Sequence, residues 1–118
     1  MHGSWSGAAA GPLLSVGKQT YVGEPLRPAV SIPANAALRR ISWRISLLSP
    51  SPTGLKIKLC SMTACILLDR LTGQKATPLP FSPGDELRFI YVVNTNGQLK
   101  PPVRVVSHQV TINYQAGR

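Results

Sequence analysis

The sequence has few acidic residues, few aromatic residues and no long apolar run. Its 118 residues include 13 lysines and arginines but only four aspartates and glutamates, and the formal net charge is +9. Such a charge attracts nucleic acid, lipid headgroups, acidic glycans and acidic protein surfaces alike, and does not choose among them. No apolar stretch approaches the ~20 residues that a membrane-spanning helix needs, so we expect a protein that does not span a membrane.

Catalytic motifs are also missing. The carboxylates are Glu24, Asp69, Asp85 and Glu86, and the adjacent pair opens a predicted strand, where successive side chains point to opposite faces. A Ser-His-Asp triad is not indicated, because no nucleophile-elbow sequence occurs, and His108, beside a proposed bulge, is interpreted as a surface residue rather than a general base. No glycine motif of the kind that cradles phosphate occurs. The sequence therefore predicts a protein that is not an enzyme and has no cofactor.

Aromatic residues make up 6% of the chain, and most of them belong to the predicted core. Trp43, Phe89 and Tyr91 fall on the apolar faces of predicted strands. Single-stranded nucleic acid is bound by aromatics set among cations, and this arrangement is absent, so we expect no nucleic-acid partner. Trp5 lies in residues 1–11, whose small polar composition predicts a flexible N-terminal arm, and its burial stays open at this point.

The 11 prolines and 10 glycines, without any helical apolar period, favour short strands joined by turns. We expect one all-β domain at residues 12–115, an antiparallel β-sandwich of about seven or eight strands, followed by a frayed end at 116–118. A small barrel is the alternative. The predicted strands are residues 12–16, 27–32, 38–48, 55–60, 65–69, 86–93 and 103–114, the last being one strand or two.

Two details of the apolar pattern sharpen this prediction. In residues 38–48, Ile41, Trp43 and Ile45 alternate with polar residues, which buries one face of the strand. Between Val105 and Val110 the apolar period shifts by an odd step, so we expect a bulge near Ser107 and His108. Residues 71–84, rich in glycine and proline, are interpreted as a long connection.

The only cysteines, Cys60 and Cys65, end two predicted strands that a four-residue turn connects. Opposed residues of such a hairpin lie about 4.5–5.5 Å apart at Cβ, close to what a disulfide needs. We favour a structural disulfide over free thiols, and over a metal or redox site, because two cysteines without nearby histidines give too few ligands and the spacing is not C-x-x-C. A disulfide persists only in an oxidising compartment.

Cations gather on the predicted outer faces of three strands. Arg40 and Arg44 share one outer face, Lys56 and Lys58 lie on the hairpin, and Arg88 lies on the strand at 86–93. If these strands are neighbours, the residues form one cationic sheet face that suits an acidic partner. The plainer interpretation is a solvated face that keeps the protein soluble.

Several segments, taken in order, resemble the FlhE family, small periplasmic proteins encoded beside export-gate components of the bacterial flagellar secretion system. They are residues 41–44 (ISWR), the loop at 50–54 (PSPTG), residues 55–60 (LKIKLC) with Cys65 following, residues 87–89 (LRF), the turn from Gly97 to Leu99, and residues 107–114 (SHQVTINY). The resemblance spans most of the chain, from Trp5 to Tyr114.

The resemblance implies an exported, non-enzymatic β-sandwich in the periplasm that keeps flagellar export and assembly orderly. It would limit proton leak and premature filament growth there, through chaperone-like contacts with rod or export-apparatus proteins. The first residues lack the apolar middle of a signal peptide, so an exported protein is expected here in its mature form, with Met1 added for expression. The alternative function is a periplasmic module that binds carbohydrate or peptidoglycan.

Overall fold

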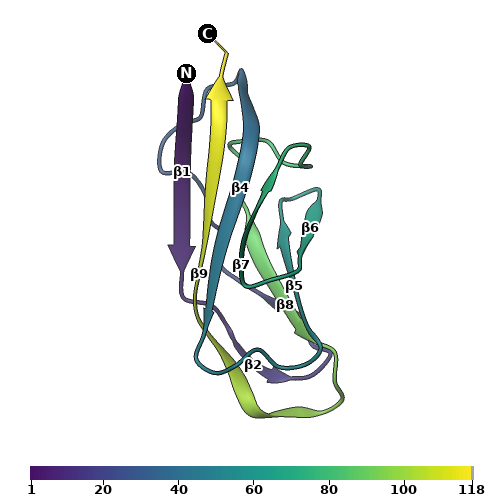
Figure 1. The fold of residues 1–118 in the computed structure, drawn as a ribbon. Coiled ribbons are helices and arrows are strands. Elements are labelled where there is room, and N and C mark those ends of the chain that lie inside the picture. The colour runs from purple at the N-terminus through teal and green to yellow at the C-terminus, as the bar shows by residue number, and fades with distance from the viewer. Residues whose placement is uncertain (118) are drawn as a thin grey trace.

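Alternating apolar and polar residues build two antiparallel β-sheets that face each other (Figure 1). The structure is a computed structural model, and it describes residues 1–117. The first sheet has the order β1-β9-β4-β7, with β2 also paired to β9, and the second has the order β3-β8-β5-β6. The strands are β1 (His2–Ala9), β2 (Leu13–Val16), β3 (Tyr21–Val22), β4 (Ala36–Leu47), β5 (Leu55–Cys60), β6 (Cys65–Leu68), β7 (Thr72–Ala76), β8 (Arg88–Val93) and β9 (Gln98–Ala116).

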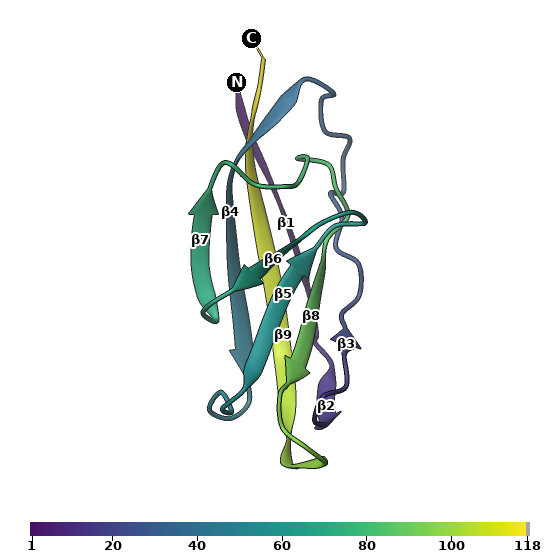
Figure 2. The ribbon, with the colours of Figure 1, turned by 90° about the vertical axis from the view of Figure 1, so that its right-hand side faces the viewer.

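The predicted all-β sandwich is therefore confirmed, with nine strands where seven or eight were expected. The molecule is elongated, 52 × 22 × 21 Å, and Figure 2 shows the second sheet lying in front of the first. In the part of the chain that the structure describes, no helix is long and apolar enough to cross a membrane.

The core fills the space between the sheets with the inward residues of both. On β4, the predicted alternation holds, since Ile41, Trp43 and Ile45 are buried. On β8, Phe89 and Tyr91 are buried as predicted. The remaining large buried residues include Leu14, Leu26, Leu38, Ile57, Leu59, Leu68, Phe81, Leu87, Val93, Val103, Val105, Val110 and Ile112.

β9 is the long central strand, and it contains the predicted bulge. Ser46 of β4 pairs with Ser107, but the next residue, Leu47, pairs with Val105, so Val106 is the extra residue. The bulge resets the alternation. It brings Val105 onto the same buried face as His108, Val110 and Ile112, which alternate regularly after it. The prediction of a surface histidine is wrong, because His108 lies two residues before Val110 on this face and is completely buried.

Residues 2–9 are not a flexible arm. They form β1, which pairs with β9 from His2–Gln115 to Ala9–His108. Trp5 is buried, and its indole Nε1 donates a hydrogen bond to the carbonyl of Pro83 at 2.7 Å. Glycine lowers strand propensity, but Gly3 lies under the ring of Tyr114, where a Cβ atom would clash.

Three smaller predictions are also corrected. Residues 27–32 form no strand, and only Leu26 bridges to Leu87 beside them. Residues 71–84 include a strand, β7, which pairs with β4. Ala116 is not frayed but ends β9, with its N–H bonded to the Met1 carbonyl; Arg118 lies outside the described residues.

Candidate functional site

The structure divides the five predicted surface cations between the two sheets. Arg40 and Arg44 lie on β4 in the first sheet, whereas Lys56 and Lys58 lie on β5 and Arg88 on β8 in the second. They therefore do not form one cationic face, and that prediction is wrong in this respect. The alternation of apolar and polar residues predicts which side chains of a strand face outward, but it does not predict to which sheet the strand belongs.

The outer face of the second sheet combines cations with exposed apolar residues, and we call it the β5–β8 face. Lys58 pairs with Ile90 of β8 on one side and with Leu67 of β6 on the other, and Ile90 pairs in turn with Val22 of β3. Leu67 is 54% exposed and Val22 is 52% exposed. One row across four strands thus consists of an apolar residue on β3, an apolar residue on β8, a lysine on β5 and an apolar residue on β6.

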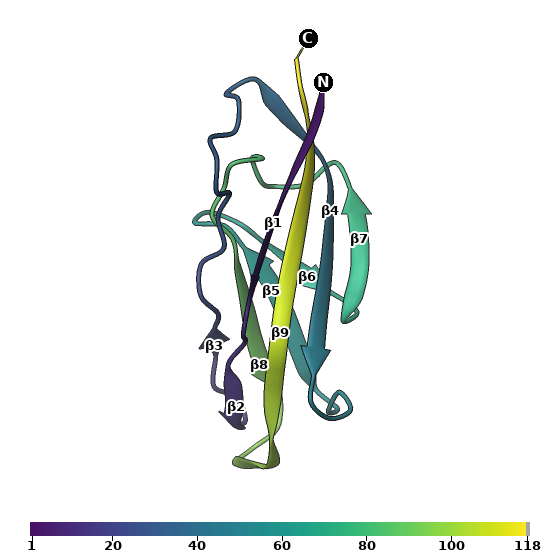
Figure 3. The ribbon, with the colours of Figure 1, turned by 90° about the vertical axis from the view of Figure 1, so that its left-hand side faces the viewer.

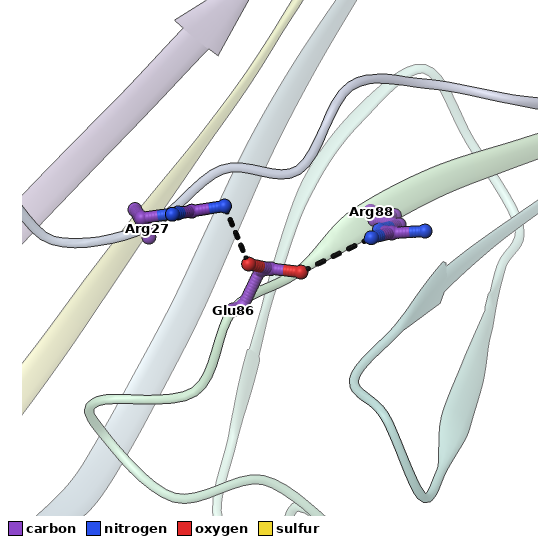
Figure 4. Close-up of polar contacts among 3 residues, drawn as sticks. All are labelled: Arg27, Glu86 and Arg88. Carbon is purple, nitrogen blue, oxygen red and sulfur yellow. Dashed lines mark hydrogen bonds and ion pairs between the residues drawn. The ribbon is translucent and has the colours of Figure 1, made fainter.

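Arg88 on this face belongs to a small charged cluster (Figure 4). Glu86 contacts Arg27 with one carboxylate oxygen at 2.7 Å and Arg88 with the other at 3.2 Å. Arg88 Nε is buried and has no hydrogen-bond partner among the described residues. Because Glu86 neutralises part of this cluster, Lys56 and Lys58 are the cations of the face that have no ion-pair partner within the described chain.

A hollow of about 240 Å³ adjoins the disulfide at one end of the β5–β8 face. Cys60 and Cys65 are opposed at the neck of the β5–β6 hairpin and are joined, as predicted. Their turn holds Met62, which is 83% exposed. The hollow is lined by Val22, Cys60, Ser61, Met62, Glu86, Arg88 and Ile90. The disulfide thus fixes a turn that carries an exposed apolar side chain beside the face.

The outer face of the first sheet is polar instead. A shallow hollow of about 450 Å³ lies over β4, β7 and β9. Serine, threonine, glutamine and arginine side chains project there in register, as Ser42 pairs with Thr111 and Gln74, and Arg44 with Gln109 and Thr72. Trp43 also lines this hollow, but it is only 4% exposed, and none of the exposed large apolar side chains of the described chain is aromatic.

The buried polar pair lies between the sheets. The Tyr91 hydroxyl is 2.6 Å from His108 Nδ1, and the imidazole stacks on Phe89 with ring centroids 4.6 Å apart. Burial lowers the pKa of His108 to about 4 and raises the pKa of the Tyr91 hydroxyl above its usual value. Both groups are therefore neutral, and the Tyr91 hydroxyl and His108 Nδ1 share one hydrogen bond. His108 Nε2 has no partner among the described residues.

This pair does not make a catalytic centre. His108 is fully buried and forms no hydrogen bond with a carboxylate of residues 1–117, so a general base there would lack both access and an orienting acid. Within residues 1–117, histidine, cysteine, aspartate and glutamate side chains form no cluster that could hold a metal ion. The pair is part of the core, packed between the two sheets.

Comparison with known proteins identifies the family. The model of the family described as flagellar protein FlhE matches residues 11–115. The chain belongs to the FlhE family. Flagellar protein FlhE of Yersinia enterocolitica is 35% identical over 114 residues, which cover 96% of this chain and 81% of that protein. Flagellar protein FlhE of Escherichia coli (strain K12) is 33% identical over 116 residues, which cover 96% and 85%.

A crystal structure of FlhE has the same fold. It superposes with a TM-score of 0.84 at 30% sequence identity and covers 97% of each chain. The resemblance drawn from the ordered segments of the sequence is therefore confirmed. It makes the chain a flagellar protein, and none of the FlhE names describes an enzyme.

Proposed function

We propose that this FlhE family member is a non-enzymatic periplasmic accessory protein of the flagellar type III export system. It binds rod or export-apparatus proteins in a chaperone-like way, and so limits proton leak and premature filament growth in the periplasm. Membership of the FlhE family, which is described as a flagellar protein family, supports a role in the flagellar system. The Cys60–Cys65 disulfide agrees with an oxidising compartment.

The observation that carries the proposal is the composition of the β5–β8 face. Lys56 and Lys58 have no ion-pair partner within the described chain, and they stand among Leu67, Ile90 and Val22. Apolar residues supply most of the binding free energy of a protein interface, whereas charges mainly steer association and select partners. A partner that fits presents apolar residues flanked by carboxylates.

The alternative, a module that binds carbohydrate or peptidoglycan, finds its best location in the polar hollow of the first sheet. Hydroxyl and amide groups such as Ser42, Thr111 and Gln74 can hydrogen-bond a sugar. The shortage of exposed aromatic rings counts against it. Retention on purified cell wall that survives high salt would favour this alternative, because binding by charge alone is screened by salt.

A binding experiment tests the β5–β8 face directly. The double variant Lys56→Glu, Lys58→Glu is compared with the native chain for binding to purified flagellar rod proteins at low ionic strength. We expect an affinity loss of about tenfold or more, since two attractive charges become repulsive. Arg40→Glu, Arg44→Glu is the matched control, because it makes the same change of net charge on the other sheet.

Equal loss of affinity in both double variants would mean that net charge matters and this face does not. Unchanged affinity in Lys56→Glu, Lys58→Glu would contradict the face as a docking site. In cells, the gene deletion is expected to alter swimming, periplasmic filament formation or proton leak. A wholly normal phenotype would count against the flagellar role in export.

A further inference from the structure

The two sheets have five edge strands, and four of them are protected against pairing with another chain. β3 has only two residues, and Pro25 and Pro28 follow it. β2 and β6 have four residues each, and the Tyr21 hydroxyl accepts hydrogen bonds from two N–H groups of β2. β7 carries Lys75 and leads to Pro78 and Pro80. Short length, lysine and proline are the means by which proteins prevent edge-to-edge association.

The fifth edge, β1, has none of these protections. It runs over eight residues, HGSWSGAA, without proline, lysine, arginine or carboxylate. Its pairing with β9 continues from His2 to Ala9 without a register shift. Figure 3 views the molecule from this side and shows β1 running along the front, with no strand on its outer side. A long, regular, unprotected edge is what strand addition needs.

The hydrogen-bond pattern shows which groups this edge offers. The Met1 carbonyl accepts from the Ala116 N–H at 2.8 Å, so Met1 and Ala116 form a hydrogen-bonded pair. In an antiparallel ladder such pairs alternate with non-bonded ones. The odd residues of β1 therefore bond to β9, and the main chain of His2, Ser4, Ser6 and Ala8 faces away. Within residues 1–117 these four residues have no other main-chain partner.

β1 is also held in place from the inside. Trp5 is bonded to Pro83, Leu26 packs closely against Gly7, and the Tyr114 ring covers Gly3. An entering strand thus meets an edge that is already extended and ordered. Binding therefore causes little further loss of conformational entropy in β1, and such a loss is a main cost of association.

Charge selects the kind of strand that fits. A second copy of the chain would bring +9 against +9, which opposes pairing of β1 with itself. The four acidic residues are already counted in this net charge, and three of them are engaged within the chain, as Asp69 and Glu86 contact arginines and Asp85 accepts the Ser82 N–H. An acidic strand is attracted where a second copy is repelled.

We propose that β1 is an acceptor edge, to which an extended, acidic, proline-free segment of a protein partner adds as a further strand of the first sheet. This deepens the proposed function and depends on it only in requiring a protein partner. Main-chain bonds to Ser4, Ser6 and Ala8 supply affinity, and the carboxylates of the segment supply selectivity.

The test uses a synthetic ten-residue peptide in which valine and threonine alternate with glutamate, and a matched peptide with prolines at alternate positions. Amide exchange is followed by NMR in the intact chain. The first peptide is expected to slow exchange at Ser4, Ser6 and Ala8, whose amides face outward, and the proline peptide is not. No slowing at these amides, or slowing confined to the β5–β8 face, would overturn the proposal.

Variants of the edge make the test independent of the peptide chosen. Ser4→Pro with Ala8→Pro removes two outward N–H groups that β9 does not use, and we expect binding about tenfold weaker. Ser4→Ala with Ala8→Ser keeps both N–H groups, and should bind within about twofold of the native chain. Equal binding by both pairs of variants would overturn the proposal.

Two further measurements separate the explanations. If the proline variant fails to fold, the amide-exchange experiment on the native chain still shows whether the peptide binds at β1. If sedimentation shows association of the chain with itself through β1, the occupant is a second copy and the proposed acidic segment is wrong. The affinity of Lys56→Glu, Lys58→Glu for rod proteins tests the β5–β8 face by itself, so failure at β1 leaves the proposed function standing.

Discussion

The two sheets have similar inner faces and different outer ones. Inside, both present buried aliphatic and aromatic residues, such as Ile41 and Trp43 on one sheet and Phe89 and Tyr91 on the other. Outside, the first sheet is covered by hydroxyl, amide and guanidinium groups, whereas the β5–β8 face mixes lysines with exposed apolar residues. Folding constrains the inner faces through burial, and it leaves the outer faces free to vary with function.

The largest expected effect disrupts the edge of the first sheet. Trp5→Ala removes a buried indole and its bond to Pro83, and should lower the free energy of unfolding by about 3–5 kcal/mol. Trp5→Phe keeps most of the apolar volume but loses the hydrogen bond to Pro83. The lost hydrogen bond should lower the free energy of unfolding by about 1 kcal/mol, in addition to any effect of repacking. Urea unfolding measures both. Equal stability of Trp5→Ala and the native chain would show that β1 contributes little to the fold.

The next effect concerns the space between the sheets and depends on pH. Burial lowers the pKa of His108 from 6.5 to about 4, so between these values the unfolded chain takes up a proton that the native chain does not. Stability is therefore complete above pH 6.5 and falls by about 3 kcal/mol as the pH drops to about 4. Thermal unfolding as a function of pH measures this slope.

His108→Leu provides the control for the acid slope. It removes the titrating group, so stability should depend less on pH between 6.5 and 4, although the Tyr91 hydroxyl loses its partner and overall stability falls. An acid slope of the same size in this variant would assign the effect to the carboxylates instead.

A smaller effect is confined to the second sheet. Opening the Cys60–Cys65 disulfide releases a short loop, and the chain-entropy model gives a loss of about 2 kcal/mol. The double variant Cys60→Ala, Cys65→Ala should have a lower urea midpoint of unfolding than the native chain. A reductant should lower the midpoint of the native chain and leave that of the variant unchanged. An unchanged midpoint of the native chain in reductant would contradict this expectation.

The smallest effect compares the two outer faces. Lys56→Glu, Lys58→Glu and Arg40→Glu, Arg44→Glu should each change the free energy of unfolding by less than about 0.5 kcal/mol per site, because none of these cations forms an ion pair within the described chain. Calorimetry measures this. A large loss in either variant would mean that the cations support the fold, and binding data from that variant could not be interpreted.

The confirmed predictions concern features that the local apolar pattern determines. The alternation around Ile41 and Trp43, the hairpin at Cys60 and Cys65, and the phase shift that predicts the bulge before His108 all depend on neighbours in the chain. The direction of each side chain follows from that alternation, so the outward orientation of the cations was predictable as well.

Predictions from the sequence were wrong where residues far apart in the chain determine the local structure. Residues 2–9 contain two glycines and one large apolar residue, and they become a strand because Tyr114, Leu26 and Pro83 close around them. His108 is a different kind of error, because its alternation with Val110 and Ile112 already places it on the buried face. The sheet to which each cation belongs is likewise a matter of long-range pairing, which no local pattern encodes.

The position of β9 sets an order of events during synthesis. β9 is the last strand to be made, and it lies between β1 and β4 and also pairs with β2 (Figure 1). Until residues 98–116 are available, three of the strands made earlier lack a neighbour, and two of these, β1 and β2, have no paired strand at all. A chain that stops short of β9 cannot assemble the first sheet, so the sandwich closes only after nearly its whole length is complete.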